Sequence, residues 1–213
     1  MENFTAYLHR TRTERGLVSR EVFESSGRLL SSWSSWALWG ATTYDLTVFE
    51  PATLPWDRLR CDIFLLGGNT GLFNGGKTTA YSNFHTRGHA GDTKLRRAVE
   101  GTPLSGAFMT DVIKDYPTAD SSDLMKDIAA GRVDMTRSFV EPLMLEFETL
   151  NAPADAAIVL MGRGTETLWN TVTAHPSVPR GLVDDLQVYG GLDHYTTGNF
   201  TEQIQDLLAR PTR

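Results

Sequence analysis

The chain has 213 residues, 40% of them hydrophobic, and a formal net charge of −6 at pH 7. This length is enough to bury a full core, and we expect one globular domain over residues 1–213. The negative charge argues against a protein that coats nucleic acids nonspecifically, because such binding depends mainly on Lys and Arg that neutralise phosphates. The single cysteine, Cys61, lies in an apolar run, which excludes a disulfide framework and an iron–sulfur cluster held by cysteines of one chain.

The sequence contains no apolar run near the roughly 18 residues of a membrane-spanning helix, and residues 1–4 do not resemble the start of a signal peptide. We therefore expect a cytoplasmic protein without a membrane partner. One local stretch is net basic, and it comprises Arg87, His89, Lys94, Arg96 and Arg97. Charge runs of this kind are common on exposed helices, so a solvated helix face is the favoured interpretation and a nucleic-acid contact is the alternative.

Apolar residues recur every three to four positions between residues 22 and 40, which predicts a helix that ends at Gly40. We expect residues 1–45 to form a helical segment that packs on the rest of the domain. Trp33, Trp36 and Trp39 follow the same spacing. Tryptophans spaced in this way are more often core residues than a base-stacking array, and we interpret them as packing residues.

After Gly40 short apolar runs alternate with helical patterns. The predicted strands cover residues 46–49, 61–66, 107–113, 156–161 and 186–189. The predicted helices cover residues 93–99, 138–150, 165–173 and 200–209. This alternation is typical of the α/β class, and we expect a single-domain three-layer α/β/α sandwich with a mainly parallel, doubly wound central sheet.

Polar residues follow the predicted strands. In a doubly wound sheet ligands bind outside the carboxyl ends of the strands, so these residues are the candidate functional ones. The strand at 61–66 leads into Gly68 and Asn69, the strand at 107–113 carries Asp111, and the last strand is followed by His194. We expect Asn69, Asp111 and His194 to converge on one crevice, with glycines around Asn69 that allow close approach of a ligand.

The segment from Gly71 to Thr78 matches G-x-x-x-x-G-K-[ST], a loop whose amides cradle nucleotide phosphates, with Lys77 as its lysine. In such proteins the strand leads directly into the first glycine and a helix follows the loop. Here four residues intervene, and residues 79–85 lack the apolar periodicity of a helix. A P-loop NTPase is therefore an alternative and not the leading hypothesis.

His85, His89 and Asp92 are spaced like metal ligands on one helix face. Gly88 and Gly91 disfavour a helix through this segment, and three such residues in a polar loop are more often solvated than bound to a metal. We predict neither a metal nor a cofactor.

Two segments after the second predicted strand resemble known motifs. Residues 67–71 read Gly-Gly-Asn-Thr-Gly and resemble a G-x-N-P-G motif, with Thr70 in the place of the usual proline. The glycine-rich segment that follows ends at residues 82–85 and resembles a loop that carries an aromatic residue. Phe84 is that aromatic residue.

Two later segments complete the set. Residues 106–114 are similar to a strand that reads I-T-N-x-V-K, with Asp111 in the place of its asparagine. Residues 192–199 resemble an H-P-S motif and the loop after it, with His194 followed by Tyr and Thr. In this order, and placed after strands, the four segments resemble the uracil-DNA glycosylase superfamily, of which this chain looks like a divergent member from about residue 63 to its C-terminus.

The resemblance implies a metal-independent hydrolase of DNA repair that flips a deaminated or modified base, uracil-like, out of DNA and cleaves its N-glycosidic bond. The family's catalytic positions correspond to Asn69, which would orient a water, and His194, which would stabilise the departing base. The base-binding positions are Gly68, Phe84 and Asp111. The DNA-binding positions are Lys77, Asn83, Tyr195, Thr196 and Thr197.

Asp111 is the main departure from the family pattern. An asparagine amide offers both a donor and an acceptor, whereas an ionised aspartate only accepts, so it should prefer exocyclic amines and repel keto oxygens. A protonated aspartate would still donate. The alternative interpretation of Asp111 is a helix or loop cap, and that of His194 is a surface loop histidine.

Other functions stay open beside the glycosylase. The altered Thr70, Asp111 and Tyr195 are compatible with a member of the same fold that binds nucleic acid or a nucleotide without catalysis. A soluble domain with an unassigned small-molecule pocket is a further alternative. The expected partner of the leading hypothesis is DNA, bound by a monomer.

Overall fold

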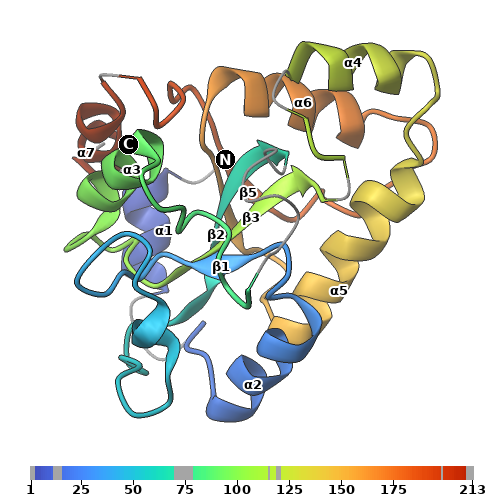
Figure 1. Ribbon diagram of the computed structural model, residues 1–213. Helices are drawn as coiled ribbons and strands as arrows, with labels where there is room; N and C mark the ends of the chain where they lie inside the picture. Colours follow the sequence, from blue (N-terminus) through green and yellow to red (C-terminus); the bar gives the residue numbers. More distant parts are fainter. Residues whose placement is uncertain are drawn as a thin grey trace.

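The computed structural model describes residues 3–11, 16–69, 79–114, 116–118, 121–197 and 199–209. Within these ranges the protein is a mixed α/β fold around a five-stranded sheet of order β1-β3-β2-β4-β5 (Figure 1). The pairs β2–β3, β2–β4 and β4–β5 are parallel, and β1 is antiparallel to β3. The predicted α/β class and the mainly parallel sheet are confirmed.

The strands that were predicted from continuous apolar runs are present. They are β2 (Arg60–Asn69), β3 (Ala107–Ile113), β4 (Ala157–Leu160) and β5 (Gln187–Tyr189). Every residue of β3 and β4 is buried, which is expected for strands covered on both faces. The strand predicted at 46–49 is wrong: Leu46–Phe49 is a short 3-10 helix, whose first turn is capped by the Asp45 carboxylate.

Seven α-helices lie in the described ranges. They are α1 (Phe4–Arg10), α2 (Arg20–Leu29), α3 (Ala90–Val99), α4 (Ser121–Ala129), α5 (Glu141–Leu150), α6 (Arg163–Thr173) and α7 (Phe200–Ala209). A π-helical turn, Thr136–Val140, precedes α5. The helices predicted by residue range correspond to α3, α5, α6 and α7, α1 and α2 lie in the segment 1–45 that was expected to be helical, and α4 was not predicted. No helix in the described portion of the chain is long and apolar enough to cross a membrane.

The helix predicted to run to Gly40 is wrong beyond α2. The chain leaves the helix after Leu29, and Ser35–Trp36 forms β1 at the edge of the sheet, paired with β3. The serines in this stretch hydrogen-bond to nearby main-chain oxygens and so compete with a regular helix: Ser31 Oγ donates to Gly27 O and Ser34 Oγ to Leu30 O. The segment predicted to be helical, residues 1–45, therefore contributes a strand as well. Trp36 and Trp39 are buried, as expected for packing residues.

The hydrophobic core forms two clusters, one on each face of the sheet. Along β2, Ile63 and Leu65 belong to one cluster and Phe64 and Leu66 to the other, as the alternation of side chains along a strand requires. Buried residues of α1, α3 and α7 join the first cluster, and residues of α2, α5 and α6 join the second. Figure 1 shows these two groups of helices on opposite sides of the strands.

The strand order reverses beside β2. The chain passes from β2 to β3 on one side and then crosses to β4 on the other side of β2. Such a reversal leaves a crevice outside the carboxyl ends of the two strands that flank it, and this is where open α/β sheets bind ligands. The position of β2 and β4 thus identifies the sheet edge at which a functional site is expected.

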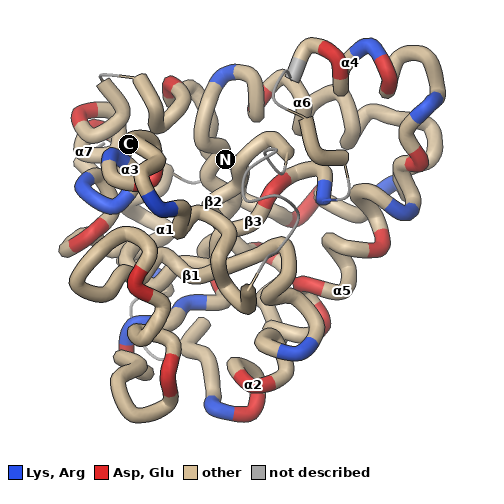
Figure 2. Tube along the Cα trace, in the orientation of Figure 1, with Lys and Arg blue, Asp and Glu red and all other residues tan. Residues whose placement is uncertain are grey.

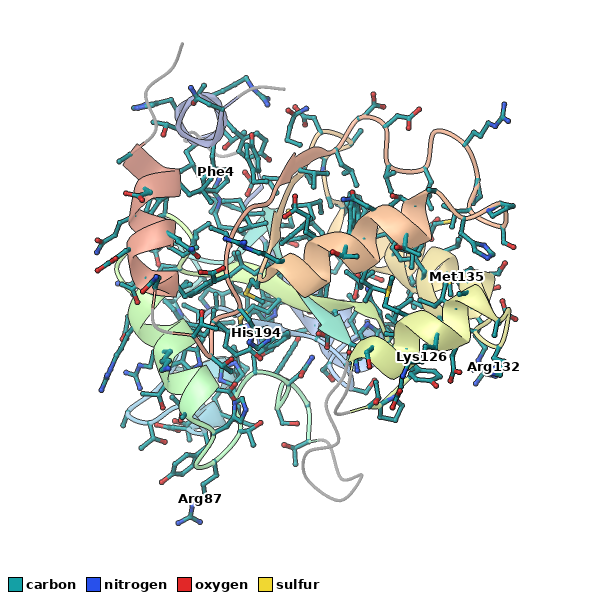
Figure 3. All side chains as sticks on the ribbon, turned by 90° about the horizontal axis from the view of Figure 1, so that it is seen from above. Phe4, Arg87, Lys126, Arg132, Met135 and His194 are labelled. Carbon is teal, nitrogen blue, oxygen red and sulfur yellow. The ribbon has the colours of Figure 1, made fainter. Side chains whose placement is uncertain are left out.

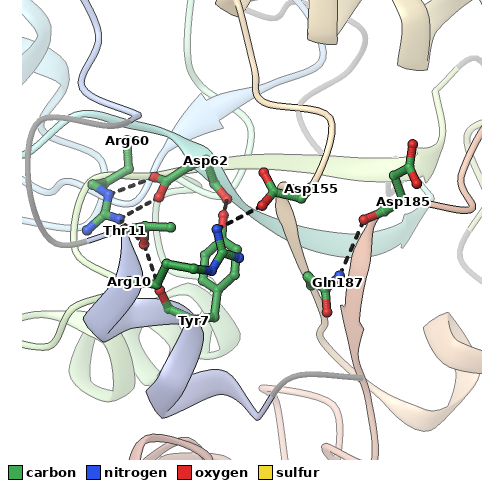
Figure 4. A network of polar contacts seen from close by, with 8 residues as sticks. All are labelled: Tyr7, Arg10, Thr11, Arg60, Asp62, Asp155, Asp185 and Gln187. Carbon is green, nitrogen blue, oxygen red and sulfur yellow. Dashed lines mark hydrogen bonds and ion pairs between the residues drawn. The ribbon is translucent and has the colours of Figure 1, made fainter.

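The opposite, amino edge of the sheet carries a polar network that fastens α1 (Figure 4). The guanidinium of Arg60 binds both carboxylate oxygens of Asp62, with Nε–Oδ1 and Nη2–Oδ2 distances of 2.8 and 2.6 Å. Tyr7 Oη donates to the main-chain oxygen of Asp62 over 2.7 Å, and Arg10 pairs with Asp155 at 2.8 Å. The fully buried Asp62 carboxylate therefore has a donor for each of its oxygens.

Candidate functional site

The site at the carboxyl edge begins with a close contact across β2 and β3. Gly67 is the register partner of Asp111. A Cβ atom at Gly67 would lie 2.3 Å from Asp111 Oδ1 and 3.3 Å from Phe84 Cζ, so only a glycine leaves room for both side chains. Gly67 thus brings a carboxylate and an aromatic ring to one point at the end of β2.

Phe84 reaches this point through an unusual backbone conformation. Its φ is 63° and that of Tyr81 is 62°, both in the left-handed region that bulky residues rarely adopt. Each such residue costs on the order of 1–3 kcal/mol. The turn is held by contacts of Tyr81, whose hydroxyl donates to Phe23 O and whose main-chain oxygen accepts from Ser35 Oγ. The surrounding packing therefore maintains a strained turn that directs Phe84 onto Gly67.

Asp111 lies inside β3 and is 4% exposed. Its Oδ2 atom accepts a hydrogen bond from Asn83 Nδ2 at 3.1 Å. The alternative interpretation as a helix or loop cap is wrong, because the side chain binds another side chain and caps no main-chain amide in the described ranges. Burial raises the pKa of the Asp111 carboxyl to about 6, although the Asn83 hydrogen bond and the charge of Lys114 oppose the shift.

A buried ion pair lies behind Asp111. Lys114 Nζ is 3.1 Å from Glu146 Oε2, and both side chains are almost fully buried. Thr110 Oγ1 and Trp33 Nε1 donate to the other carboxylate oxygen, Oε1, at 2.6 and 3.0 Å. The opposite charges of Lys114 and Glu146 act on Asp111 in opposite directions. The pair ties α5 to β3 and forms the rear of the site.

Asn69 is the last residue of β2. Its amide Nδ2 donates to the main-chain oxygens of Tyr116 and Thr118 at 3.3 and 3.1 Å, so the connection between β3 and α4 orients the amide. Gly68 faces the other way: a Cβ there would lie 3.6 Å from Thr165 Oγ1 on α6, an ordinary contact. The predicted base-binding role of Gly68 is thus restricted to its main chain.

His194 packs against the end of β4. A Cβ at Gly162 would lie 3.4 Å from His194 Cδ2, and the φ of Gly162 is 130°. Thr196 contacts His194 Nδ1 with its hydroxyl at 2.7 Å and with its main-chain amide at 3.3 Å. The amide can only donate, so we assign Nδ1 as the acceptor and the ring proton to Nε2. Burial, helped by the charge of His89, lowers the pKa of His194 below its usual value of 6.5. The ring is therefore neutral at pH 7 and presents an Nε2–H donor.

Tyr195 connects His194 to Phe84. Its ring stacks on His194 with 4.3 Å between centroids and meets Phe84 edge-on at 6.5 Å. Burial, together with the charges of Asp92 and Asp111, raises the pKa of the Tyr195 phenol, which stays protonated. Ring contacts thus run from Phe84 through Tyr195 to His194, and Phe84 and Asp111 both lie beside Gly67. In Figure 3 His194 lies between α6 and the side formed by α3 and α7.

The net basic stretch lies on α3 and the segment before it (Figure 2), beside the loop that carries His194, Tyr195 and Thr196. Lys94 Nζ donates to Thr196 O at 2.5 Å, and a Cβ at Gly91 would lie 2.7 Å from Thr196 Cγ2. Arg96 pairs with Glu100 on the same helix. Arg87 lies at the periphery in Figure 3 and covers the ring of an exposed tyrosine. Some residues of the stretch therefore support the loop that carries His194.

A polar hollow of about 450 Å³ lies beside Tyr116 and Thr118, the partners of Asn69. Lys126 and Arg132 line it, and Figure 3 shows both on this side of the molecule. Lys126 pairs with Asp123 and Arg132 with Asp127. An anion would have to compete with these carboxylates, so the hollow is not a ready phosphate site.

The side chains of His85, His89 and Asp92, which have the spacing of metal ligands, do not converge on one position. His89 Nδ1 lies 2.9 Å from Asp92 Oδ1. Both ring nitrogens of His85 face main-chain oxygens instead, those of Thr43 and Trp36, and burial lowers the pKa of His85 to about 4. Among the described residues no group of three His, Cys, Asp or Glu side chains could hold a metal ion.

The structure brings together most of the residues singled out from the sequence. Asn83 hydrogen-bonds to Asp111, Phe84 meets Tyr195 edge-on, and Thr196 and Thr197 hydrogen-bond to His194. Asn69 lies at the same sheet edge. Thr70, Lys77 and the match between Gly71 and Thr78 lie outside the described residues. Sequence reasoning missed the roles of Gly67, Gly162 and Glu146 in shaping the site, and only the glycines before Asn69 hinted at the first.

No model of a known protein family matches the chain. Comparisons with characterised proteins and with solved structures find no significant similarity. A functional assignment therefore depends on the geometry of the site at the carboxyl edge and on its chemistry.

Proposed function

We propose that the protein is a DNA-base glycosylase-like hydrolase that cleaves the N-glycosidic bond of a base flipped into the crevice at the carboxyl edge. The observation that carries the proposal is the ring contact from Phe84 through Tyr195 to His194, with Asp111 beside Phe84 at Gly67 and Asn69 at the same edge. We include in the proposal a three-layer, doubly wound α/β/α architecture, a cytoplasmic location and a monomer that acts on DNA.

The chemistry needs two groups on opposite sides of the scissile bond. Positive charge develops on the sugar and negative charge on the departing base. Asn69 would orient a water whose oxygen bonds to the anomeric carbon while the electron pair of the C–N bond leaves with the base, and the proton that the water loses ends on the released base anion. His194 would donate its Nε2–H to the developing anion, which suits a neutral imidazole with Nδ1 already accepting from Thr196.

Binding would use the aromatic and polar surface around these groups. Phe84 would stack on the flipped base, and Asp111 would contact its edge. The main chain of Gly68 would border the base. The DNA strand would pass over Lys77, Asn83, Tyr195, Thr196 and Thr197.

Base release from oligonucleotides tests the proposal. The substrates carry uracil, hypoxanthine, xanthine or mismatched thymine, or the amino-bearing bases cytosine, adenine and guanine, in single- and double-stranded form. We expect Asn69→Ala and His194→Ala each to reduce release by about 100-fold or more, the effect of removing a group that acts on the transition state. Asn170→Ala and His175→Ala, on the surface of α6 and after it, are matched controls that should retain activity. Release that is absent, or unchanged in both site variants, would contradict the proposal.

A second candidate is a member of the same fold that binds nucleic acid or a nucleotide without catalysis. The observation in its favour is that Asn69 Nδ2 is already engaged by two main-chain oxygens. This candidate predicts oligonucleotide binding that is unaffected by Asn69→Ala, together with no release of any base. Nucleotide-dependent protection from unfolding that is lost in Lys77→Ala would point instead to the P-loop NTPase.

A further inference from the structure

The polar side chains near Phe84, those of Asn83 and Asp111, each leave a hydrogen-bond acceptor for a ligand. Asn83 Nδ2 donates to Trp33 O at 2.7 Å and to Asp111 Oδ2 at 3.1 Å. A main-chain oxygen and a carboxylate oxygen both accept hydrogen bonds, so the amide orientation is unambiguous and both N–H groups are used. The atom of Asn83 left for a ligand is its carbonyl oxygen, Oδ1, an acceptor.

Asp111 presents a second acceptor. Its Oδ2 atom takes the hydrogen bond from Asn83, while Oδ1 lies over the Cα of Gly67, where a Cβ would be 2.3 Å away. Within the described residues no donor reaches Oδ1. Asp111 is only 4% exposed, so the Oδ1 acceptor lies in a largely desolvated place where a hydrogen bond from a ligand would be strong.

We propose that Asp111 Oδ1 and Asn83 Oδ1 form an acceptor pair that selects bases bearing an exocyclic amino group and rejects the corresponding keto bases. This inference rests on the proposed function and narrows its substrate class. It favours modified bases that keep their amino group over deaminated bases such as uracil. The two hydrogens of one amino group can serve the two acceptors, whereas a keto oxygen would face them with its own lone pairs.

The alternative, that Asp111 serves only the fold, is disfavoured by its surroundings. One neutral amide donates to the carboxylate, and the nearby Lys114 and Glu146 contribute charges of opposite sign. Tyr195 stays protonated, and its hydroxyl therefore adds no charge. A carboxylate with this little support stabilises a fold poorly, but it is suited to accept from an N–H donor on a base stacked against Phe84.

Three pairs of bases compare an amino member with a keto member: cytosine and uracil, adenine and hypoxanthine, guanine and xanthine. Each pair differs by an amino-to-keto exchange, which also adds a proton to the neighbouring ring nitrogen. Binding of single-stranded oligonucleotides that differ only at this base, measured at pH 7.5, should favour the amino member by on the order of 10- to 100-fold, the discrimination of a good paired contact. Base release from the same oligonucleotides is measured in parallel.

Asp111→Asn tests the acceptor pair directly, because the amide keeps the shape of the side chain and adds a donor. We expect this variant to lose or invert the amino preference, and Asn83→Ala to weaken it. Asp57→Asn, an exposed carboxamide substitution outside the site, is the matched control and should keep the wild-type preference. Thermal unfolding of each variant verifies that it is folded.

The outcomes separate this inference from the proposed function. Release of keto bases in preference to amino bases would overturn the inference and leave the glycosylase standing. An amino preference in binding that Asp111→Asn inverts, without release of any base, would support the inference and overturn the glycosylase. Equal binding within every pair, or a preference unchanged in Asp111→Asn, would overturn the inference. No binding to any oligonucleotide would overturn both.

Discussion

Two buried aspartates, one near each end of the sheet, have different partners. At the amino edge Asp62 is fully buried, and Arg60 binds both of its carboxylate oxygens. At the carboxyl edge Asp111 is almost as deeply buried, but its carboxylate accepts from the neutral amide of Asn83. A buried charge is tolerated when it is paired and fully hydrogen-bonded, and otherwise its pKa shifts.

The difference indicates what each edge does. The pair of Asp62 and Arg60 lies within β2, Tyr7 and Thr11 of the α1 segment hydrogen-bond to these two residues, and the network serves the fold. The Asp111 carboxyl, whose pKa rises to about 6, gives the fold little and keeps an oxygen for a ligand. Groups whose pKa is perturbed in a crevice are candidates for function, and this contrast supports placing the site at the carboxyl edge.

We expect the largest change in stability from a substitution at the amino edge of the sheet. Arg60→Ala removes the cation and leaves the Asp62 carboxylate buried without its partner, so we expect the free energy of unfolding in urea to fall by about 3–5 kcal/mol. Arg20→Ala is the control, because the pair of Arg20 and Glu24 is exposed and should contribute less than about 1 kcal/mol. Equal losses in the two variants would show that the amino-edge network does not stabilise the fold.

A smaller effect of opposite sign is expected at the carboxyl edge. The folded-state pKa of Asp111, about 6, lies above its usual 3.8, so the native state favours the protonated form and loses stability as the pH rises from about 4 to about 6. Asp111→Asn removes this cost. At pH 7.5 the variant should be more stable by up to about 3 kcal/mol, and at pH 4 the difference should largely vanish.

Urea unfolding of wild type and Asp111→Asn at a series of pH values measures this difference. Asp57→Asn provides the baseline for a substitution of an exposed carboxylate. A variant that is less stable than wild type at pH 7.5 would mean that Asp111 supports the fold and that the two edges do not differ as argued.

The next prediction concerns Gly67, where a side chain would reduce the stability of the fold. Gly67→Ala places a Cβ 2.3 Å from Asp111 Oδ1 and 3.3 Å from Phe84 Cζ, and such overpacking costs about 1–3 kcal/mol. The same variant should impair ligand binding. Gly164→Ala is the control, since a Cβ there meets nothing within 4 Å, and thermal unfolding should show little change. If Gly67→Ala changed neither the stability nor ligand binding, Asp111 and Phe84 would be able to move apart without loss of stability.

The elements of the fold that the sequence predicted are those with a strong periodic signal. The apolar runs of β2, β3 and β4 are almost entirely buried, and their length and hydrophobicity reveal them. The failures are short elements. Trp36 repeats the spacing of a helix although it lies in a two-residue edge strand, and Leu46–Phe49 is too short for periodicity to separate a strand from a 3-10 turn.

The candidate site could be predicted as a set of residues but not as an arrangement. The rule that ligands bind at the carboxyl ends of strands located Asn69, Asp111 and His194 at one edge. The contact of Asn83 with Asp111 depends on left-handed conformations at Tyr81 and Phe84, which no sequence pattern of non-glycine residues encodes. The acceptor character of the site follows from hydrogen-bond partners, which require coordinates.

We expect the smallest change in stability from the loss of one hydroxyl group at the amino edge. Tyr7→Phe removes the hydroxyl that donates to Asp62 O at 2.7 Å and leaves the ring in place, so it deletes one buried hydrogen bond while Arg60 still binds the carboxylate. We expect the free energy of unfolding to fall by about 1–2 kcal/mol, and to do so equally at pH 5 and pH 8, because the phenol stays protonated across this range. Tyr44→Phe, on an exposed ring, is the control and should have no measurable effect. If Tyr7→Phe cost as much as Arg60→Ala, the hydroxyl would contribute as much to the stability of the fold as the ion pair within β2, and the contrast between the two edges could not rest on the pairing of the Asp62 carboxylate.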